Sequence, residues 1–370
     1  MSEKILPNWV SKKLKDFVNY KKGKKPKGKS EEYSEGYVPY LSTTYLRDGI
    51  ISSFAKVDES VIPVNDRDIL LIWDGSNAGE FLKGKKGILS STMVKINIKS
   101  NIFNKDYLFY QLKKKEIYLR KLTQGTGIPH VDKSVLMNIS IPKPPLPEQE
   151  KIASILSKVD EQIKETERII EKTELLKKGL MQKLLTKGIG HTKFKNTELG
   201  EIPEEWDIVE FGTFTKQMKD TVLPDKQNKL IYVGLEHIKP KEIFLSDYGT
   251  SDSVKSLKFK FKQNDILYGK LRPYLDKAVL ATEKGICSTD IIVIQSKSNS
   301  TQDFVIYILH SKRFLDYVNG TTAGSNLPRT SWKSIYKYKI PLPPLPEQEK
   351  IASILSKVDT QLQDNHNYLN

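Results

Sequence analysis

A lysine-rich segment near the start of the chain is the first whose side chains could bind an anion. Residues 21–29 contain two glycines and a proline among six lysines: Lys21, Lys22, Lys24, Lys25, Lys27 and Lys29. Because like charges repel and Gly and Pro disfavour regular structure, we expect a mobile basic loop. Facing a phosphate backbone, it would add salt-dependent affinity without reading bases. A merely solvated surface loop is the alternative.

Two further segments combine turn residues with hydrogen-bonding side chains. Residues 268–277 offer a basic and aromatic set, which is Lys270, Arg272, Tyr274 and Lys277. Such a loop could clamp phosphates or place Arg272 against a guanine edge, although an ordinary basic hairpin has the same composition. The corresponding loop of residues 73–80 is polar and glycine-rich, with Ser76 and Asn77 suited to hydrogen bonding; its lysines follow at Lys83, Lys85 and Lys86.

Residues 125–130 and 324–329 form a third pair of similar turns. Their candidate contacts to phosphate are Thr126 and His130 in the first turn, and Ser325, Asn326 and Arg329 in the second. A packed turn that only fixes the direction of the following segment is the alternative. We predict contact with the anion.

Motifs for catalysis are missing from the sequence. It contains no Gly-x-x-x-x-Gly-Lys-Ser/Thr, Gly-x-Ser-x-Gly or His-Glu-x-x-His pattern, and no Asn-Pro-Pro-aromatic or Asp-Pro-Pro-Tyr run of amino-methyltransferases. The single cysteine, Cys287, and five scattered histidines have no zinc-ligand spacing. We therefore expect no catalytic residue, metal or cofactor in this chain.

Composition indicates a basic, multi-domain globular protein. The 370 residues carry a formal charge of +15 and are 38% hydrophobic, which suits about two to three domains. The excess charge favours a polyanionic partner without proving one. Apolar stretches such as 69–73 and 304–309 are far shorter than the roughly 20 residues of a membrane span, and the start lacks an apolar signal core. We expect a cytoplasmic location.

An internal repeat organises the chain. Ile141 to Ile163 and Ile340 to Leu362 differ at only three of 23 aligned positions. Weaker matches extend upstream: Asp68-Ile69-Leu70 with Asp265-Ile266-Leu267, Tyr110 with Tyr307, and Trp9 with Trp206. The stretches 12–65 and 216–263 share almost nothing. Two similar scaffolds thus carry diverged surfaces, so each half could recognise a different target.

The near-identical segments predict helices that begin after Pro147 and Pro346, the first continuing to about Thr186. Apolar residues spaced by three or four along them predict an antiparallel coiled coil within the chain, because the second helix must return along the first. Its seam would contain Leu156, Val159, Ile163, Ile170, Leu176, Leu180, Leu355, Val358, Leu362 and Leu369. Part of the longer first helix has no counterpart in the second. Two unrelated surface helices are the alternative.

Short β-branched runs at 68–73, 93–98, 265–268 and 290–295 predict strands, and 104–121 and 301–319 predict helices. The expected fold class is α+β, with two tandem domains separated by the coiled coil and related by a pseudo-twofold repeat. The expected boundaries are 1–142 for the first domain, 143–187 for the first repeat helix, 188–341 for the linker and second domain, and 342–370 for the short second helix.

Three sets of segments carry a resemblance to a known family. They are the two PLPEQEKIASILSKVD segments, the bridge Leu180 to Thr186 with Gly200 to Trp206, and Gly269 to Lys277 with Gly285 to Asp290. Together they resemble the specificity subunit of type I restriction-modification systems. The resemblance covers nearly the whole chain. It implies two target-recognition domains that each read one half of a bipartite duplex DNA site, held apart by a coiled coil that sets the unread spacer.

The same resemblance implies partners that perform the chemistry. Two modification (methyltransferase) subunits would bring S-adenosylmethionine, and restriction (endonuclease and translocase) subunits would bring ATP and Mg. The chain itself would be a non-catalytic adaptor. A half-site or decoy specificity chain, and a scaffold that binds only proteins, are the alternatives.

Overall fold

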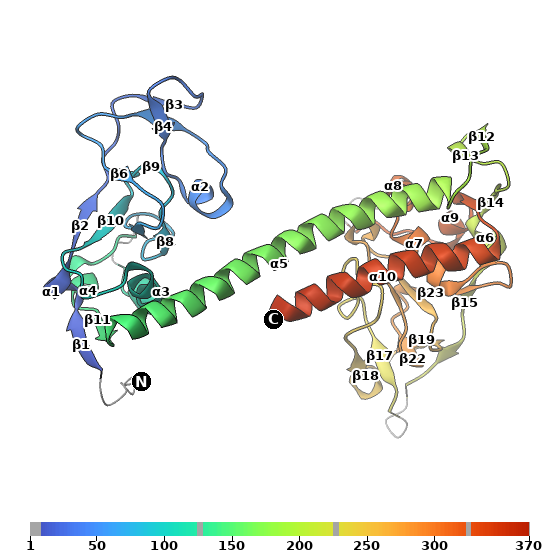
Figure 1. Ribbon diagram of the computed structural model, residues 1–370. Helices are drawn as coiled ribbons and strands as arrows, with labels where there is room; N and C mark the ends of the chain where they lie inside the picture. Colours follow the sequence, from blue (N-terminus) through green and yellow to red (C-terminus); the bar gives the residue numbers. More distant parts are fainter. Residues whose placement is uncertain (1–8, 124–128, 225–228, 323–326, 370) are drawn as a thin grey trace. The chain divides into compact units, whose positions relative to one another are not determined.

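The computed structural model describes residues 9–123, 129–224, 229–322 and 327–369. The chain divides into two compact units, Met1–Lys164 and Glu165–Asn370, so the division falls within the long helix α5 (Leu146–Lys187). Figure 1 labels the elements of both units.

The first unit begins with short strands and ends in the first part of α5. Its strands are β1 (Val10–Lys13), β2 (Val18–Lys22), β3 (Lys29–Ser30), β4 (Tyr37–Pro39), β5 (Phe54–Lys56), β6 (Pro63–Val64), β7 (Ile69–Ile72), β8 (Phe81–Lys83), β9 (Gly87–Ile88), β10 (Met93–Ile98) and β11 (Ser140–Lys143). Its other helices are α1 (Leu14–Phe17), α2 (Thr43–Asp48), α3 (Lys105–Lys121) and α4 (Lys133–Met137).

The second unit contains the rest of α5 and a similar series of elements. Its strands are β12 (Phe194–Thr197), β13 (Gly200–Pro203), β14 (Asp207–Glu210), β15 (Thr215–Met218), β16 (Thr221–Val222), β17 (Ile231–Val233), β18 (Gly249–Thr250), β19 (Lys258–Phe261), β20 (Ile266–Gly269), β21 (Ala278–Leu280), β22 (Gly285–Cys287), β23 (Ile291–Ser296) and β24 (Lys339–Leu342). Its helices are α6 (Phe211–Phe214), α7 (Gln302–Leu309), α8 (Lys312–Gly320), α9 (Trp332–Tyr336) and α10 (Leu345–Leu369), with 3-10 turns η1 (Ser251–Ser253) and η2 (Pro273–Leu275).

Both units are built on the same antiparallel sheet. The strand order is β2-β10-β7-β8 in the first unit and β15-β23-β20-β21 in the second, and the pairs β1–β11 and β14–β24 also correspond. The central strands are short apolar runs because both of their faces are covered. In β7, Ile69 and Leu71 pack in the cluster with α3, whereas Leu70 and Ile72 pack in a second cluster on the other face. The four predicted strands and the α+β class are confirmed.

The segments without sequence similarity fold differently in the two units. The first unit adds a three-stranded sheet, β3-β5-β4, and the pair β6–β9. The second unit adds a five-stranded sheet, β16-β19-β22-β17-β18. The additions share one part, because the antiparallel pair β6–β9 corresponds to β19–β22 and the parallel bridge of Tyr40 with Ile88 corresponds to the parallel pair β17–β22. They differ in the remaining strands.

A buried glutamine makes equivalent hydrogen bonds at the start of each long helix. Gln149 accepts a hydrogen bond from the Asn104 amide at 2.8 Å, and its amide donates to the carbonyls of Pro144 and Ile102. Gln348 accepts from Ser300 and Thr301, and donates to the carbonyls of Pro343 and Asn299. Both side chains are fully buried, so each ties a helix to the loop before α3 or α7.

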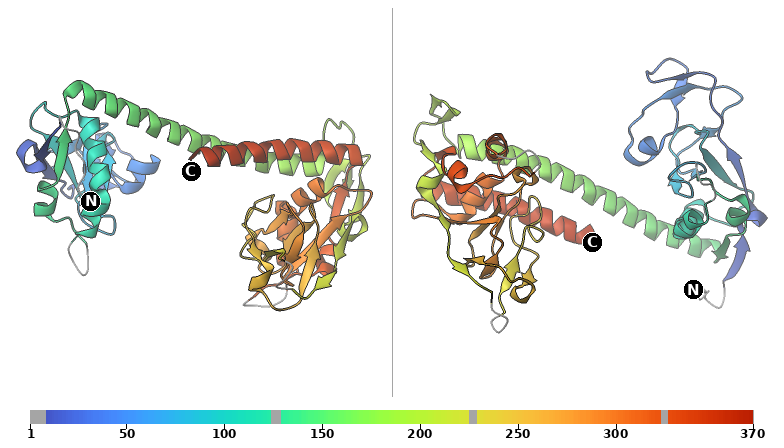
Figure 2. Two further views of the ribbon diagram at one scale, coloured as in Figure 1. Left: turned by 90° about the horizontal axis from the view of Figure 1, so that it is seen from below. Right: turned by 180° about the vertical axis from the view of Figure 1, so that it is seen from behind.

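The last turns of α5 and the first half of α10 pack antiparallel in the second unit, which is seen in both figures (Figures 1 and 2). Leu184 shares a buried cluster with Ala352 and Leu355, and Lys177 forms an ion pair with Asp359. The antiparallel arrangement of the helices is confirmed. The expectation for Leu176 is wrong: it is 55% exposed, because Thr173 and Lys177 occupy the inner face of that turn.

Three other expectations need correction. The predicted helix 301–319 is two helices, because Ser311 accepts the Phe314 amide and starts α8 after α7 has ended. The lysine-rich segment is not irregular throughout, since β2 includes Lys21 and Lys22, and β3 starts at Lys29. The backbone of β2 is paired with β10, while the side chains of Lys21 and Lys22 stay exposed. Leu156, Val159 and Ile163 of α5 are 37%, 44% and 40% exposed, so they are not buried seam residues.

Candidate nucleic-acid interface

The predicted loops at 73–80 and 270–277 are equivalent connections of the two sheets. Each joins two antiparallel strands in the same register, with Leu71 opposite Phe81 in one unit and Tyr268 opposite Ala278 in the other. Each also has two residues with positive φ at matching positions. These are Gly75 (φ 105°) and Gly79 (φ 94°) in the first loop, and Arg272 (φ 51°) and Asp276 (φ 53°) in the second.

Each loop is attached to the turn that the sequence singled out separately. The Gly75 amide donates to the carbonyl of Pro129 at 2.9 Å, and a β-bridge joins Asp74 to His130. The Arg272 amide donates to the carbonyl of Pro328 at 2.8 Å, and a bridge joins Leu271 to Arg329. We call residues 73–80 with 129–130 the first loop–turn cluster, and residues 270–277 with 328–329 the second.

In the first loop–turn cluster the exposed groups are mainly neutral. Ser76 and His130 are exposed and Asn77 is half-buried. The Lys22 ammonium, at the end of β2, lies 2.7 Å from the Asp74 carboxylate and brings the lysine-rich segment to the edge of the cluster. The other five lysines of that segment are also exposed: Lys21, Lys24, Lys25, Lys27 and Lys29.

Two of the three predicted lysines that follow the first loop have internal partners. The Lys83 ammonium lies 3.2 Å from the Tyr110 hydroxyl and 5.0 Å from the Phe109 ring centroid. Lys85 donates to the carbonyl of Tyr45 at 2.8 Å, and burial lowers its pKa. Lys86 is exposed. The role of Lys83 and Lys85 in DNA binding stays a prediction, and a DNA contact would compete with the aromatic rings and the carbonyl that hold them here.

In the second loop–turn cluster the exposed groups are basic and aromatic. Arg272 is exposed and Tyr274 is 55% exposed. Lys270 and Arg329 both approach the Asp290 carboxylate, at 3.8 and 3.6 Å. The Lys277 ammonium donates to the carbonyl of Leu235 at 2.6 Å, so its predicted contact with DNA would require this hydrogen bond to break.

Three titratable residues that lie near these clusters were not identified from the sequence. They are Asp290, which lies between Lys270 and Arg329, and the pair Asp276 and His310, which are hydrogen-bonded at 2.7 Å. The sequence signal for His310 was a lone histidine at the end of an apolar helix run. The predicted Thr126, Ser325 and Asn326 lie outside the described residues.

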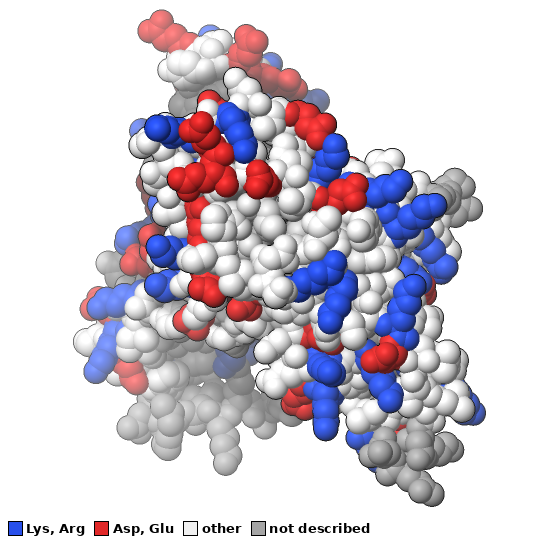
Figure 3. All heavy atoms as spheres, turned by 90° about the vertical axis from the view of Figure 1, so that its right-hand side faces the viewer, with Lys and Arg blue, Asp and Glu red and all other residues white. Residues whose placement is uncertain are grey.

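Charge is unevenly distributed over the second unit. In Figure 3 Asp and Glu side chains gather towards the end that carries β12 and β13, and Lys and Arg side chains are more frequent towards the lower part. A polyanion would meet less repulsion at the basic part.

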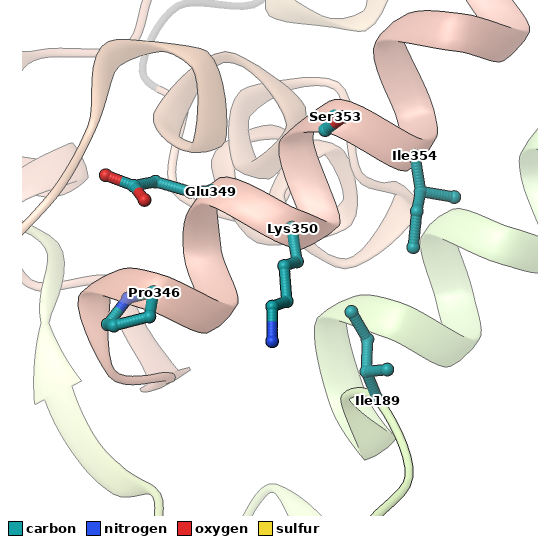
Figure 4. Close-up of a pocket in the computed structure, with 6 residues that line it drawn as sticks. All are labelled: Ile189, Pro346, Glu349, Lys350, Ser353 and Ile354. Atoms are coloured by element: carbon teal, nitrogen blue, oxygen red, sulfur yellow. The ribbon is translucent and has the colours of Figure 1, made fainter.

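The described residues also form a hollow of about 470 Å³ beside the start of α10. Figure 4 shows Lys350 between Pro346 and Ile189, with Ile354 of α10 directed towards Ile189. The remaining lining residues are Glu349 and Ser353. In Figure 4 the Glu349 carboxylate and the Ser353 hydroxyl point away from the Lys350 ammonium.

Comparison with known proteins decides the family. A family model for the type I restriction modification DNA specificity domain matches residues 7–175 and again residues 203–370. The chain belongs to this family. The resemblance seen in the sequence is therefore confirmed, and the duplicated scaffold is a pair of type I specificity domains.

Individual relatives agree with this assignment. The type I restriction enzyme MjaVIII specificity subunit of Methanocaldococcus jannaschii is 40% identical, over 97% of this chain and 88% of the relative. The EcoDI specificity subunit of Escherichia coli is 25% identical, over 95% of this chain and 82% of the relative. A crystal structure of the type I S subunit from M. genitalium covers all of this chain and 93% of its own, with a TM-score of 0.66 at 17% identity, and so shares its fold.

As a type I specificity subunit, the chain recognises DNA for a restriction-modification complex. In the part of the chain that the structure describes, no helix has both the length and the apolar character to span a bilayer.

Proposed function

We propose that this specificity subunit binds a bipartite duplex, and that each unit reads one half-site through its own loop–turn cluster. The main support is that the two clusters share one backbone but present different side chains. Gly75 stands where the second unit has Arg272, and His130 corresponds to Arg329. Reading surfaces that differ on equivalent scaffolds suit two different half-sites.

Base contacts in the second half-site come from Arg272, supported by Tyr274, because a guanidinium can donate two hydrogen bonds to a guanine edge in the major groove. Ser76, Asn77 and His130 act in the first unit. Exposed lysines such as Lys24, Lys25, Lys27 and Lys86 bind phosphates and give affinity without sequence preference.

The chain acts as a non-catalytic adaptor in this proposal. Two modification subunits bind S-adenosylmethionine, and restriction subunits bind ATP and Mg, whereas this chain binds no cofactor. The absence of nucleotide-binding, nucleophile and amino-methyltransferase motifs from the sequence supports this division of labour. The complex works in the cytoplasm.

The test is selection of bound duplexes from a randomised pool by the full-length chain assembled with its modification partners. We expect a split sequence with two defined half-sites, and affinity that falls steeply with rising salt. Binding that does not respond to salt, or a pool without any enriched sequence, would reject DNA recognition by this chain in favour of a protein-binding scaffold. Enrichment of one half-site alone would favour the half-site alternative.

The helices are proposed to set the unread gap. Inserting one heptad into α5 and one into α10 should change the tolerated spacer while the bases of each half-site stay the same. A change in the selected bases themselves would contradict this role.

A further inference from the structure

His310 is a buried histidine at the end of α7 whose two ring nitrogens both face acceptors. Its side chain is 4% exposed. Nδ1 lies 2.7 Å from Asp276 Oδ1, and Nε2 lies 2.9 Å from the carbonyl oxygen of Ala278. Asp276 is itself 8% exposed. The pair therefore joins α7 to the end of the 270–277 loop and to the first residue of β21.

The chemistry of these partners determines the protonation of the ring. A carbonyl oxygen only accepts hydrogen bonds, so Nε2 must carry a proton. The 2.7 Å contact at Nδ1 is a hydrogen bond that shares one proton with the Asp276 carboxyl group. Both ring nitrogens of His310 are therefore held in hydrogen bonds, which fix the orientation of the ring. The other titratable side chain close to Asp276 is Tyr268, whose hydroxyl is buried and whose pKa is raised by burial and by the Asp276 charge, so it stays neutral.

The Asp276–His310 pair lies next to a loop whose backbone conformation is unfavourable for non-glycine residues. Asp276 and Arg272 both have positive φ, which non-glycine residues adopt reluctantly. The Asp276 amide donates to Pro273, and its carbonyl accepts from the Lys241 amide at 2.9 Å. The Asp276 side chain is thus an anchor at one end of η2, and Arg272 lies at the other end.

The first unit lacks both members of the pair. Tyr110 and Tyr307 donate equivalent hydrogen bonds to Asp160 and Asp359, and this fixes the alignment of α3 with α7. In this alignment Lys113 stands where the second unit has His310, and Gly79 stands where it has Asp276. Both residues have therefore changed together between the units.

The first unit holds its loop through different contacts. Gly79 adopts its positive φ freely, and a Cβ there would lie 2.8 Å from Arg120 Cγ. Glu116 of α3 accepts a hydrogen bond from the Phe81 amide at 3.1 Å, and Lys113 pairs with Glu116 at 2.8 Å.

We infer that His310 is a positioning residue for DNA reading by the second unit: through Asp276 it fixes the 270–277 loop in the conformation that presents Arg272 and Tyr274. This inference rests on the proposed function. A buried polar pair contributes little net stability but restricts geometry, and a contact that must meet a base edge gains affinity and selectivity from being ordered beforehand.

The experiment uses the full-length chain with its modification partners, and duplexes that carry its selected half-sites or single-base variants of them. For His310→Gln we expect selectivity at the second half-site to fall about tenfold. Selectivity at the first half-site and the salt dependence should stay at the wild-type level. His237→Gln is the matched control in the same unit, because its Nδ1 accepts from a backbone amide instead of facing a carboxylate.

A second variant keeps the inference testable should His310→Gln fail to fold. Asp276→Gly with His310→Leu removes both members of the pair together: glycine fits the positive φ, and leucine suits the buried site at the end of α7. We expect this double variant to fold and to lose selectivity at the second half-site. Wild-type selectivity in either folded variant would overturn the positioning role.

A spectroscopic measurement tests the contact directly. The ring ¹⁵N signals of His310 should show hydrogen bonds at both nitrogens, and Asp276→Gly should change the Nδ1 signal while the Nε2 signal stays. An Nδ1 signal that Asp276→Gly leaves unchanged would overturn the contact. Failure of the proposed function would look different, since wild-type chain would then show no selectivity at either half-site.

Discussion

Arg272 occupies the backbone position in the second unit that Gly75 occupies in the first. Both residues have positive φ, at 51° and 105°, and both donate their amide to the carbonyl of a proline, Pro328 or Pro129. A conformation that suits glycine is thus kept at a position that carries a large exposed cation. The strain is consistent with a side chain retained for contact rather than for folding.

Arg272→Gly should abolish base discrimination by the second unit without disturbing its fold, because glycine adopts the same backbone more easily. A bidentate arginine–guanine pair contributes about 1–3 kcal/mol of discrimination, so affinity for the preferred second half-site should fall by roughly 5- to 150-fold. Duplex binding to single-base variants measures this change.

The matched control is Lys284→Ala, which removes an exposed positive charge at the far end of β21. It should weaken binding to all duplexes slightly and equally. If Arg272→Gly behaved in the same way as this control, the arginine would be a phosphate contact.

Asp68 and Asp265 are equivalent residues with opposite electrostatics. Asp68 lies 2.6 Å from the Lys95 ammonium and 2.5 Å from that of Lys105, and these contacts lower its pKa despite the burial that opposes them. Asp265 accepts from the amide of Gln295 at 2.7 Å, and burial raises its pKa. Asp68→Asn should destabilise the first unit by about 1.5–3 kcal/mol. Asp265→Asn should cost less in the second, because no ion pair is lost and the asparagine oxygen can still accept from the Lys262 amide.

The pH dependence of stability should also differ between the Asp68 and Asp265 variants. A lowered pKa means that Asp68 stabilises the folded state above its unfolded pKa of about 3.9, and that this contribution is lost as pH falls through the lower folded value. A raised pKa means that Asp265 opposes folding at neutral pH, and that the opposition disappears as pH falls through the raised value. Denaturant unfolding of each variant between pH 3 and pH 7 tests both signs; equal profiles for the two variants would contradict them.

Gln348→Ala should loosen the start of α10, because it leaves the carbonyls of Pro343 and Asn299 without their buried donor. Each unsatisfied buried group costs about 1–3 kcal/mol. Hydrogen exchange should show faster exchange in α10 and around residue 300, and Gln182→Ala, an exposed glutamine on α5, should leave exchange unchanged. Unchanged protection in Gln348→Ala would show that apolar packing alone holds the helix.

Lys177→Met should weaken the pairing of α5 with α10, because it leaves Asp359 with the Tyr307 hydroxyl but no cation. The side chains of Lys177 and Asp359 are 15% and 16% exposed. The loss of stability should therefore be larger than the roughly 0–1 kcal/mol that a surface ion pair contributes. A double-mutant cycle with Asp359→Asn measures the coupling. A coupling energy near zero would assign the contact between the helices to their apolar residues.

Much of the architecture was determined by the sequence alone. The repeat at Ile141 and Ile340, the apolar runs of β7 and β20 and the heptad-like spacing of α5 depend on local chemistry, which a linear pattern preserves. They were sufficient to predict two α+β domains, antiparallel helices and the family. The predicted helix at 301–319 was wrong because Ser311 interrupts it, and a cap of this kind competes closely with helix continuation.

The tertiary structure decided which predicted residues lie together and which are available. Only folding brought Arg272 to Pro328, turned Lys277 towards Leu235 and placed Lys83 against aromatic rings. It also joined Asp276 to His310, which are far apart in the sequence and belong to no motif. The physical reason is that hydrogen bonds and ion pairs between distant segments depend on strand register and helix packing, and neither leaves a periodic trace along the chain.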